Sequence, residues 1–89
     1  MSDERYKKEI VAFGKKLREL RLERNLIQLD FEAAVGKART EISKIENGQL
    51  NIEFFTIVRL AEVLNVELRT LFEPLKENTN GKDKSTSEE

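Results

Sequence analysis

The sequence predicts an all-α protein, a compact five-helix bundle. Two observations lead to this prediction. In successive segments of the 89-residue chain, apolar side chains recur at spacings of three and four residues, which places them on one face of a helix. These segments are separated by residues that typically end helices, namely Gly36, Gly48, Asn65 and Pro74. We therefore expect one helical domain over residues 1–75, followed by a disordered polar tail without apolar residues over residues 76–89.

The first helix is expected to begin near Glu4, with Ser2 or Asp3 as its cap. One apolar stripe along it faces the core and consists of Tyr6, Ile10, Phe13, Leu17 and Leu20. Gly14 lies inside this helix, where glycine costs about 1 kcal/mol relative to alanine. We expect this position to allow the close approach of a neighbouring helix.

The other side of the first helix is basic, with Lys7, Lys8, Lys15 and Arg18 among its residues. Residues 1–24 carry eight Lys and Arg against five Asp and Glu, whereas the whole chain has a net charge of −1. Overall charge thus does not indicate a large non-specific affinity for nucleic acid. The basic face of this helix is compatible with phosphate contacts from its C-terminal half or with a purely solubilising role.

The segment 26–48 is predicted to form two short helices joined by a tight turn at Gly36, a residue that readily takes a left-handed conformation. The first of these helices runs from about Gln28 to Val35. Phe31 and Val35 are its expected core contacts. Ile27 precedes it and has no side-chain acceptor for a capping hydrogen bond, so this end of the helix lacks a usual source of stability.

The second short helix covers about residues 38–47. Ala38, Ile42 and Ile45 follow one another at i, i+4 and i+7 and predict its buried underside. The opposite face is polar and consists of Arg39, Thr40, Ser43, Lys44 and Asn47. A short helix with hydrogen-bond donors on its free face suits the major groove of DNA. For any one of these residues, an ordinary solvated helix surface is the alternative interpretation.

This stretch resembles the helix-turn-helix of the Cro/repressor-like (Xre) family, which has the lambda repressor-like DNA-binding fold. The resemblance rests on Gln28, Phe31, Val35, Gly36, Ile42, Ser43, Ile45, Glu46, Asn47 and Gly48. It extends into FGKKLRELR before and LAEVLNVELRTLF after, about 60 of the 89 residues. Four positions depart from the usual pattern, at Ile27, Phe31, Glu32 and Ile52. The small size, without an effector domain, resembles the controller proteins of restriction–modification systems.

The resemblance implies a five-helix DNA-binding domain that acts as a dimer. It implies that Gln28 contacts a phosphate and that the base edges or backbone are met by Arg39, Thr40, Ser43 and Lys44. It also implies a structural salt bridge between Arg21 and Glu46, which would tie the first helix to the third. Asn47 and Asn51 complete the predicted DNA-binding set, and Asn51 is in addition a good cap for the next helix.

The fourth predicted helix spans about residues 52–64, and nine of its thirteen residues are apolar. A helix this apolar must be covered on more than one side. Its expected core face consists of Phe54, Ile57, Ala61 and Leu64. The remaining apolar residues Phe55, Val58 and Val63 predict a dimer interface, and burial within the same chain is the alternative. A fifth helix is expected from about Glu67 to Phe72, before Pro74.

We therefore predict a sequence-specific double-stranded DNA-binding regulator of transcription, a repressor or autoregulator that binds its operator as a homodimer with the third helix in the major groove. The alternative is a protein–protein interaction module, such as an antitoxin, that binds a partner through the fourth helix. The chain has no Cys and no His, so no enzyme, metal or cofactor is expected. No small-molecule ligand is evident. Without an apolar span or signal segment, a cytoplasmic location away from membranes is expected.

Overall fold

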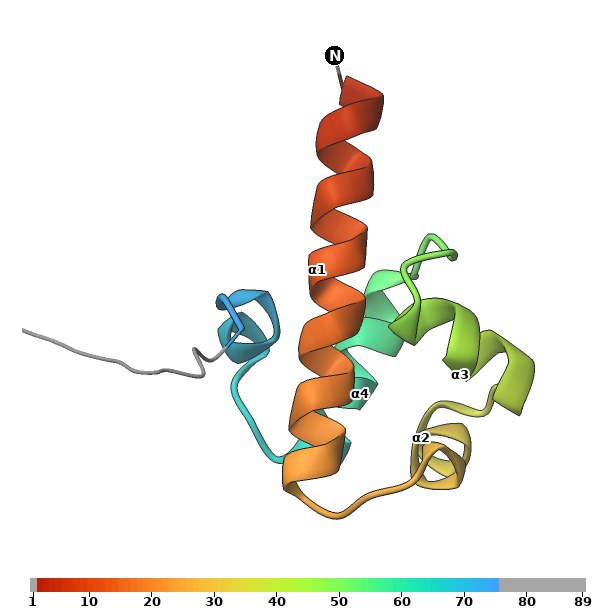
Figure 1. Cartoon of the computed structure of the whole chain (residues 1–89). Helices are drawn as coiled ribbons and strands as arrows, with labels where there is room; N and C mark the ends of the chain where they lie inside the picture. The colour runs from red at the N-terminus through yellow and green to blue at the C-terminus, as the bar shows by residue number, and fades with distance from the viewer. Residues whose placement is uncertain (1, 76–89) are drawn as a thin grey trace, which may run out of the picture.

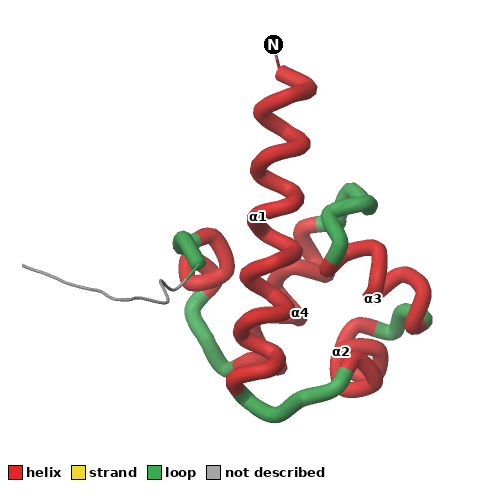
Figure 2. The backbone as a smooth tube through the Cα atoms, viewed as in Figure 1, coloured by secondary structure: helices red, strands yellow, loops and turns green. Residues whose placement is uncertain are grey.

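A long N-terminal helix, α1, crosses the body of the molecule, and shorter helices gather around its C-terminal half (Figure 1). The computed structural model describes residues 2–75. Its elements are α1 (Ser2–Glu23), α2 (Gln28–Val35), α3 (Arg39–Glu46), α4 (Phe54–Leu64) and the 3-10 helix η1 (Leu68–Phe72). Figure 2 shows that loops join these elements, and residues 2–75 include no strand. The predicted tail, residues 76–89, lies outside the described residues.

The all-α prediction is confirmed, but the count of five α-helices was wrong. The fifth segment is a single 3-10 helix of five residues, in which the N–H of Thr70 donates to the carbonyl of Glu67 at 2.9 Å. Pro74 follows closely, lacks an N–H and restricts the residue before it, so there is no room for a longer helix. The segment still contributes a side chain to the hydrophobic core, because Leu71 is completely buried.

The hydrophobic core lies where α1, α3, α4 and η1 meet, and α2 packs against α3 and α4 to close it. Its buried apolar residues are Phe13, Leu17, Leu20, Phe31, Ile42, Ile45, Leu60, Ala61, Leu64 and Leu71. Each large side chain among them contributes about 1.5–3 kcal/mol by leaving water. The predicted stripe of α1 is therefore confirmed for Phe13, Leu17 and Leu20. Tyr6 is exposed, because the first turns of α1 extend beyond the body (Figure 1).

Close packing between α1 and α3 occurs at Gly14, as the sequence predicted. A Cβ atom at this position would lie 2.5 Å from the carbonyl oxygens of both Ile45 and Glu46. These are backbone atoms of a helix and cannot move aside as a flexible side chain would. The absent side chain at Gly14 thus sets the distance between α1 and α3.

The start and the buried face of α4 differ from the prediction. The helix begins at Phe54, with Glu53 at the N-cap position, so Asn51 is not its cap. Phe54 was expected in the core but is 66% exposed, whereas the polar residue Thr56 is buried. Apolar residues occur all round this helix, so their spacing did not define one face. Ala61 and Leu64 lie in the core as predicted, and Leu60 joins them.

Three predicted helix ends are confirmed by left-handed backbone conformations. Gly36 has φ of 72°, Gly48 has φ of 71° and Asn65 has φ of 58°. At the C-terminal end of α4, Nε of Arg24 donates to the carbonyl of Leu64 at 2.8 Å. Within residues 2–75, no helix combines the length and apolar character needed to cross a membrane.

The C-terminal end of the described chain is attached to α1 through Lys16. This side chain is buried, and its ammonium donates to the carbonyl of Pro74 at 3.1 Å and to the carboxylate of Glu19 at 3.2 Å. The sequence pattern gave no sign of this, since a lysine on a helix surface is normally solvated. The contact fixes the segment after η1 against the middle of α1.

The Gly14→Ala variant should be less stable than the native protein by about 1–3 kcal/mol, because the added methyl group overpacks the contact between α1 and α3. Urea denaturation followed by circular dichroism measures this difference. Ala12→Gly, on the exposed side of the same helix, is the control for helix propensity and should cost about 1 kcal/mol. A stabilised Gly14→Ala protein would contradict the close packing.

Candidate nucleic-acid interface

The turn between α2 and α3 is built around Gly36, whose N–H donates to the carbonyl of Glu32 at 2.8 Å. The chain then re-enters a helix at Arg39, and Ala38 occupies the N-cap position. Ala38 was predicted on the buried underside of α3, but it is exposed, because a residue just before the first turn points away from the helix face that packs. The underside is formed by Ile42 and Ile45, both almost fully buried.

A buried ion pair joins α1 to α3, as the family resemblance implied. Arg21 donates from Nε to Oε2 of Glu46 at 2.7 Å and from Nη2 to Oε1 at 3.0 Å. The two residues are 8% and 6% exposed, so neither charge is solvated by bulk water. The remaining terminal nitrogen, Nη1, donates to the carbonyl of Leu26 at 3.1 Å. The same arginine therefore holds α1, α3 and the segment that leads into α2.

Gln28 and Ser43 extend this ion pair into a network. The amide nitrogen of Gln28 donates to Oε1 of Glu46 at 3.2 Å, and the hydroxyl of Ser43 donates to the amide oxygen of Gln28 at 3.2 Å. Both side chains are half-buried. The first turn of α2 is thereby fixed against the middle of α3. Two residues predicted to contact DNA are thus also bonded to one another.

Arg39 stands at the start of α3 with its side chain 63% exposed. Its Nε donates to Oε2 of Glu32 at 2.8 Å, which links the two helices across the turn. Glu32 of α2 is therefore the carboxylate that orients Arg39. Within the described residues, the terminal nitrogens of Arg39 have no recorded partner. The guanidinium is held in place while the N–H groups of its two terminal nitrogens remain available.

The other polar residues of α3 share its outer side. Thr40, Lys44 and Asn47 are exposed, and Ser43 lies between them and the network beneath. Asn51 is also exposed, but it belongs to the loop after α3 and lines a different feature, an apolar groove of about 170 Å³. This groove lies between α1, the loop and η1. The predicted DNA-binding residues therefore gather on α3 and the start of α2, except for Asn51.

The predicted dimer residues of α4 do not form one continuous exposed surface. Phe55 is 67% exposed, and the guanidinium of Arg59 lies 5.9 Å from the centre of its ring. Val58 is half-buried, and Val63 packs against the core of its own chain. Two further exposed aromatic residues were not in the predicted set: Phe54, and Phe72 of η1, which contacts Phe13 with ring centres 5.2 Å apart.

A comparison with protein families supports the same interpretation of α2 and α3. The family model described as helix-turn-helix matches residues 17–71, which include both helices, the core and the network beneath α3. The chain belongs to this helix-turn-helix family. It is a DNA-binding regulator family of the Xre and Cro type. No curated protein matches the sequence.

Two solved structures resemble this helix-turn-helix protein. The restriction–modification controller protein C.AhdI from Aeromonas hydrophila is 37% identical, with a TM-score of 0.69 over 73% of this chain and 98% of that one. A hypothetical transcription factor, NHTF from Neisseria, is 24% identical, with a TM-score of 0.68 over 74% and 76% of the two chains. The second likeness shows the fold. With the family match, the likeness to C.AhdI supports a DNA-binding transcription regulator.

We expect Arg21→Ala and Glu46→Ala each to lower the melting temperature, because each leaves a buried charge without its partner at a cost of about 3–5 kcal/mol. The double variant should lose less than the sum of the two single losses. Thermal unfolding of the four proteins measures this coupling. The pair of exposed residues Arg69 and Glu67 provides the control, with little coupling expected. Strict additivity for Arg21 and Glu46 would contradict the structural role of the pair.

Proposed function

We propose that this protein is a sequence-specific regulator of transcription that binds double-stranded DNA as a homodimer and places α3 in the major groove. The observation behind this proposal is the polar outer face of α3, held from beneath by the buried pair of Arg21 and Glu46. Membership of the helix-turn-helix family supports it.

The dimensions of α3 suit the groove. Eight residues of α-helix are about 12 Å long, and a helix with side chains is about 10–12 Å across, close to the width of the major groove. In this mode of binding, residues near the start of the recognition helix contact base edges. Arg39 and Thr40 occupy that position. The contact of Arg39 with Glu32 uses Nε, so the outer nitrogens can bond O6 and N7 of a guanine together.

We propose that residues before and after Arg39 and Thr40 contact the phosphates of the DNA. Gln28 opens α2, where free backbone N–H groups and the helix dipole favour an anion. Since its side chain is bonded to Glu46 and Ser43, the backbone N–H groups are the more direct phosphate donors. Lys44 and Asn47 lie one to two turns after Arg39 and complete the contact surface, and Asn51 is assigned a phosphate contact from the following loop.

Dimerisation is proposed because two half-sites one helical turn apart require two copies of α3. The exposed aromatic side chains Phe54, Phe55 and Phe72 offer the surface for a second copy of the chain. Of the residues predicted from the sequence, Phe55 is the strongest candidate, whereas Val63 contributes chiefly to its own core.

The regulatory role is proposed by likeness to C.AhdI, which is named as a restriction–modification controller protein. In this role the protein acts as a repressor or autoregulator through its position relative to a promoter. The second candidate function, a module that binds another protein as antitoxins do, is favoured by one observation: two adjacent phenylalanines at the start of α4 are largely exposed. Loss of DNA binding with rising salt, at a slope of several charges, supports the first function.

Arg39→Ala should relax the preference for one base pair in each half-site, because a guanidinium contact to guanine is worth about 1–3 kcal/mol of discrimination. Selection of binding sites from random duplexes measures the preference at every position. Lys44→Ala should instead weaken all sequences alike if it contacts phosphate. Arg69→Ala, which removes the same charge as Arg39→Ala from η1, is the control. An unchanged selected sequence for Arg39→Ala would contradict its base-reading role.

The native protein should sediment as a dimer at tens of micromolar, and the Phe55→Asp variant should shift towards monomer because a carboxylate cannot be buried there cheaply. Sedimentation velocity across a concentration series gives the dissociation constant. Leu29→Asp, at an exposed apolar position on α2, is the matched control and should remain dimeric. A monomeric native protein would count against the homodimer.

A further inference from the structure

The basic residues of α1 divide into two groups by whether a carboxylate neutralises them. Arg5 pairs with Glu9 at 3.9 Å, while Lys16 and Arg21 pair with Glu19 and Glu46. Among residues 2–75, no ion pair or hydrogen bond is recorded for the side chains of the other four. These four exposed residues, Lys7, Lys8, Lys15 and Arg18, are here called the basic stripe.

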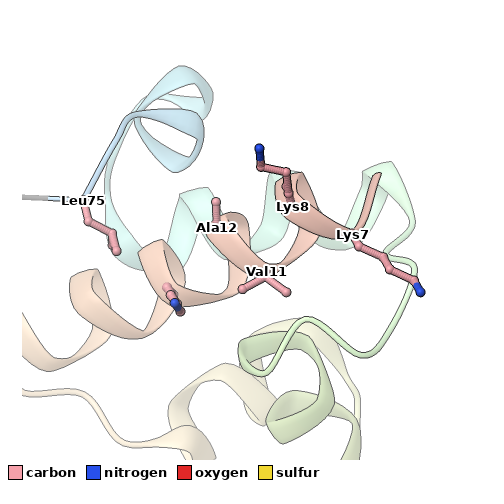
Figure 3. Close-up of a pocket in the computed structure, with 6 residues that line it drawn as sticks. Lys7, Lys8, Val11, Ala12 and Leu75 are labelled. Atoms are coloured by element: carbon pink, nitrogen blue, oxygen red, sulfur yellow. The ribbon is translucent and has the colours of Figure 1, made fainter. Parts of the chain in front are cut away.

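Helical spacing places the basic stripe on one side of α1. Lys7, Lys15 and Arg18 stand eight and three residues apart, and Lys8 lies seven residues before Lys15, so all four fall within about a third of the helix circumference. Glu4 is the one carboxylate of α1 that lies centrally on this side. Since it offsets only one of the four positive charges, the stripe keeps a positive net charge. Lys7, Lys8 and Lys15 also line one open hollow of about 450 Å³, and among residues 2–75 no carboxylate lines it (Figure 3).

The basic stripe borders the segment that follows α3. Val11 stands between Lys7 and Lys15 on the stripe, and a Cβ atom at Gly48 would lie 2.8 Å from its Cα atom. Gly48 directly follows Asn47, the last residue of the proposed DNA-binding face of α3. In Figure 3, Val11 lies on the side of α1 that faces the green ribbons of α3 and its following turn. The stripe therefore adjoins the proposed DNA surface at the C-terminal end of α3.

Most of the stripe lies outside the part of the chain that matches the helix-turn-helix family. That match begins at residue 17, so Lys7, Lys8 and Lys15 all precede it, and Lys7 and Lys8 stand on the first turns of α1, which extend towards solvent (Figure 1). These turns add little to the core, because residues 3–9 are all exposed. Packing thus does not explain why Lys7 and Lys8 stand on these turns.

We propose that the basic stripe is a second DNA-contacting surface, which binds the phosphates of the duplex flanking the half-site read by α3. This inference rests on the proposed function, and it adds a sequence-independent contact outside the operator core. Lysines suit this task because an ammonium binds phosphate as a point charge without reading the base. Each phosphate neutralised releases counterions and adds about 0.9 to the slope of log affinity against log salt.

The test compares two duplexes that carry the site obtained by selection, one ending at the operator edges and one longer by about one helical turn, roughly 10 base pairs, on each side. Binding is measured by fluorescence anisotropy over a salt series. The double variant Lys7→Gln with Lys15→Gln is compared with the control Arg5→Gln with Arg69→Gln. The control removes the same charge from exposed sites off the stripe.

The native protein should bind the longer duplex more tightly and with a steeper salt slope, by about one unit for each lysine that contacts phosphate. The Lys7→Gln, Lys15→Gln variant should lose this advantage while retaining its affinity for the short duplex. The control should keep the advantage. Equal losses in the two double variants, or a native protein that gains nothing from the flanks, would overturn the proposal.

The outcomes separate this proposal from the proposed function. A native protein that binds the short duplex without gaining from flanking DNA overturns the role of the stripe alone. A native protein for which selection returns no site overturns both. The Arg39→Ala variant should keep the difference between the long and short duplexes, because it alters base reading and leaves the stripe intact.

Discussion

The buried pair of Arg21 and Glu46 is the interaction on which the proposed DNA surface depends. Its charges are out of water, so their attraction must offset a large desolvation cost, and a well-packed apolar pair would often be at least as stable. The value of the pair lies in what it positions. Glu46 belongs to α3 and accepts from both Arg21 and Gln28, while Ser43 bonds Gln28 in turn. One carboxylate thereby sets the placement of three helices.

Gly14 complements this network by limiting the distance between α1 and α3. The ion pair draws the two helices together, and the missing side chain at Gly14 lets the backbone of α3 come within contact distance. A polar attraction and a steric allowance thus act between the same two helices, at positions about two turns apart along α1. The outer face of α3 can remain polar and exposed, because its position is fixed by contacts on its other side.

The sequence predicted those structural features whose signal lies within a few neighbouring residues. The bounds of α2 agree with the prediction because Gly36 ends the helix and the helical residue pattern begins at Gln28. The pairing of Arg21 with Glu46 came from the family resemblance, since no pattern relates residues that far apart. The buried face of α4 could not be read, because apolar residues surround that helix. The contact of Arg39 with Glu32 was missed for another reason: it crosses a turn whose geometry spacing rules do not describe.

The attachment of Lys16 to Pro74 bears on where the domain can be shortened. The family match stops at residue 71, yet a buried ammonium on α1 draws one of its two protein acceptors from the carbonyl of residue 74. Cutting the chain directly after η1 would leave Glu19 as the sole recorded acceptor and would uncover apolar surface beside Ala12, where Leu75 now lines the hollow. The smallest unit that preserves these contacts therefore reaches Leu75, four residues beyond the end of the family pattern.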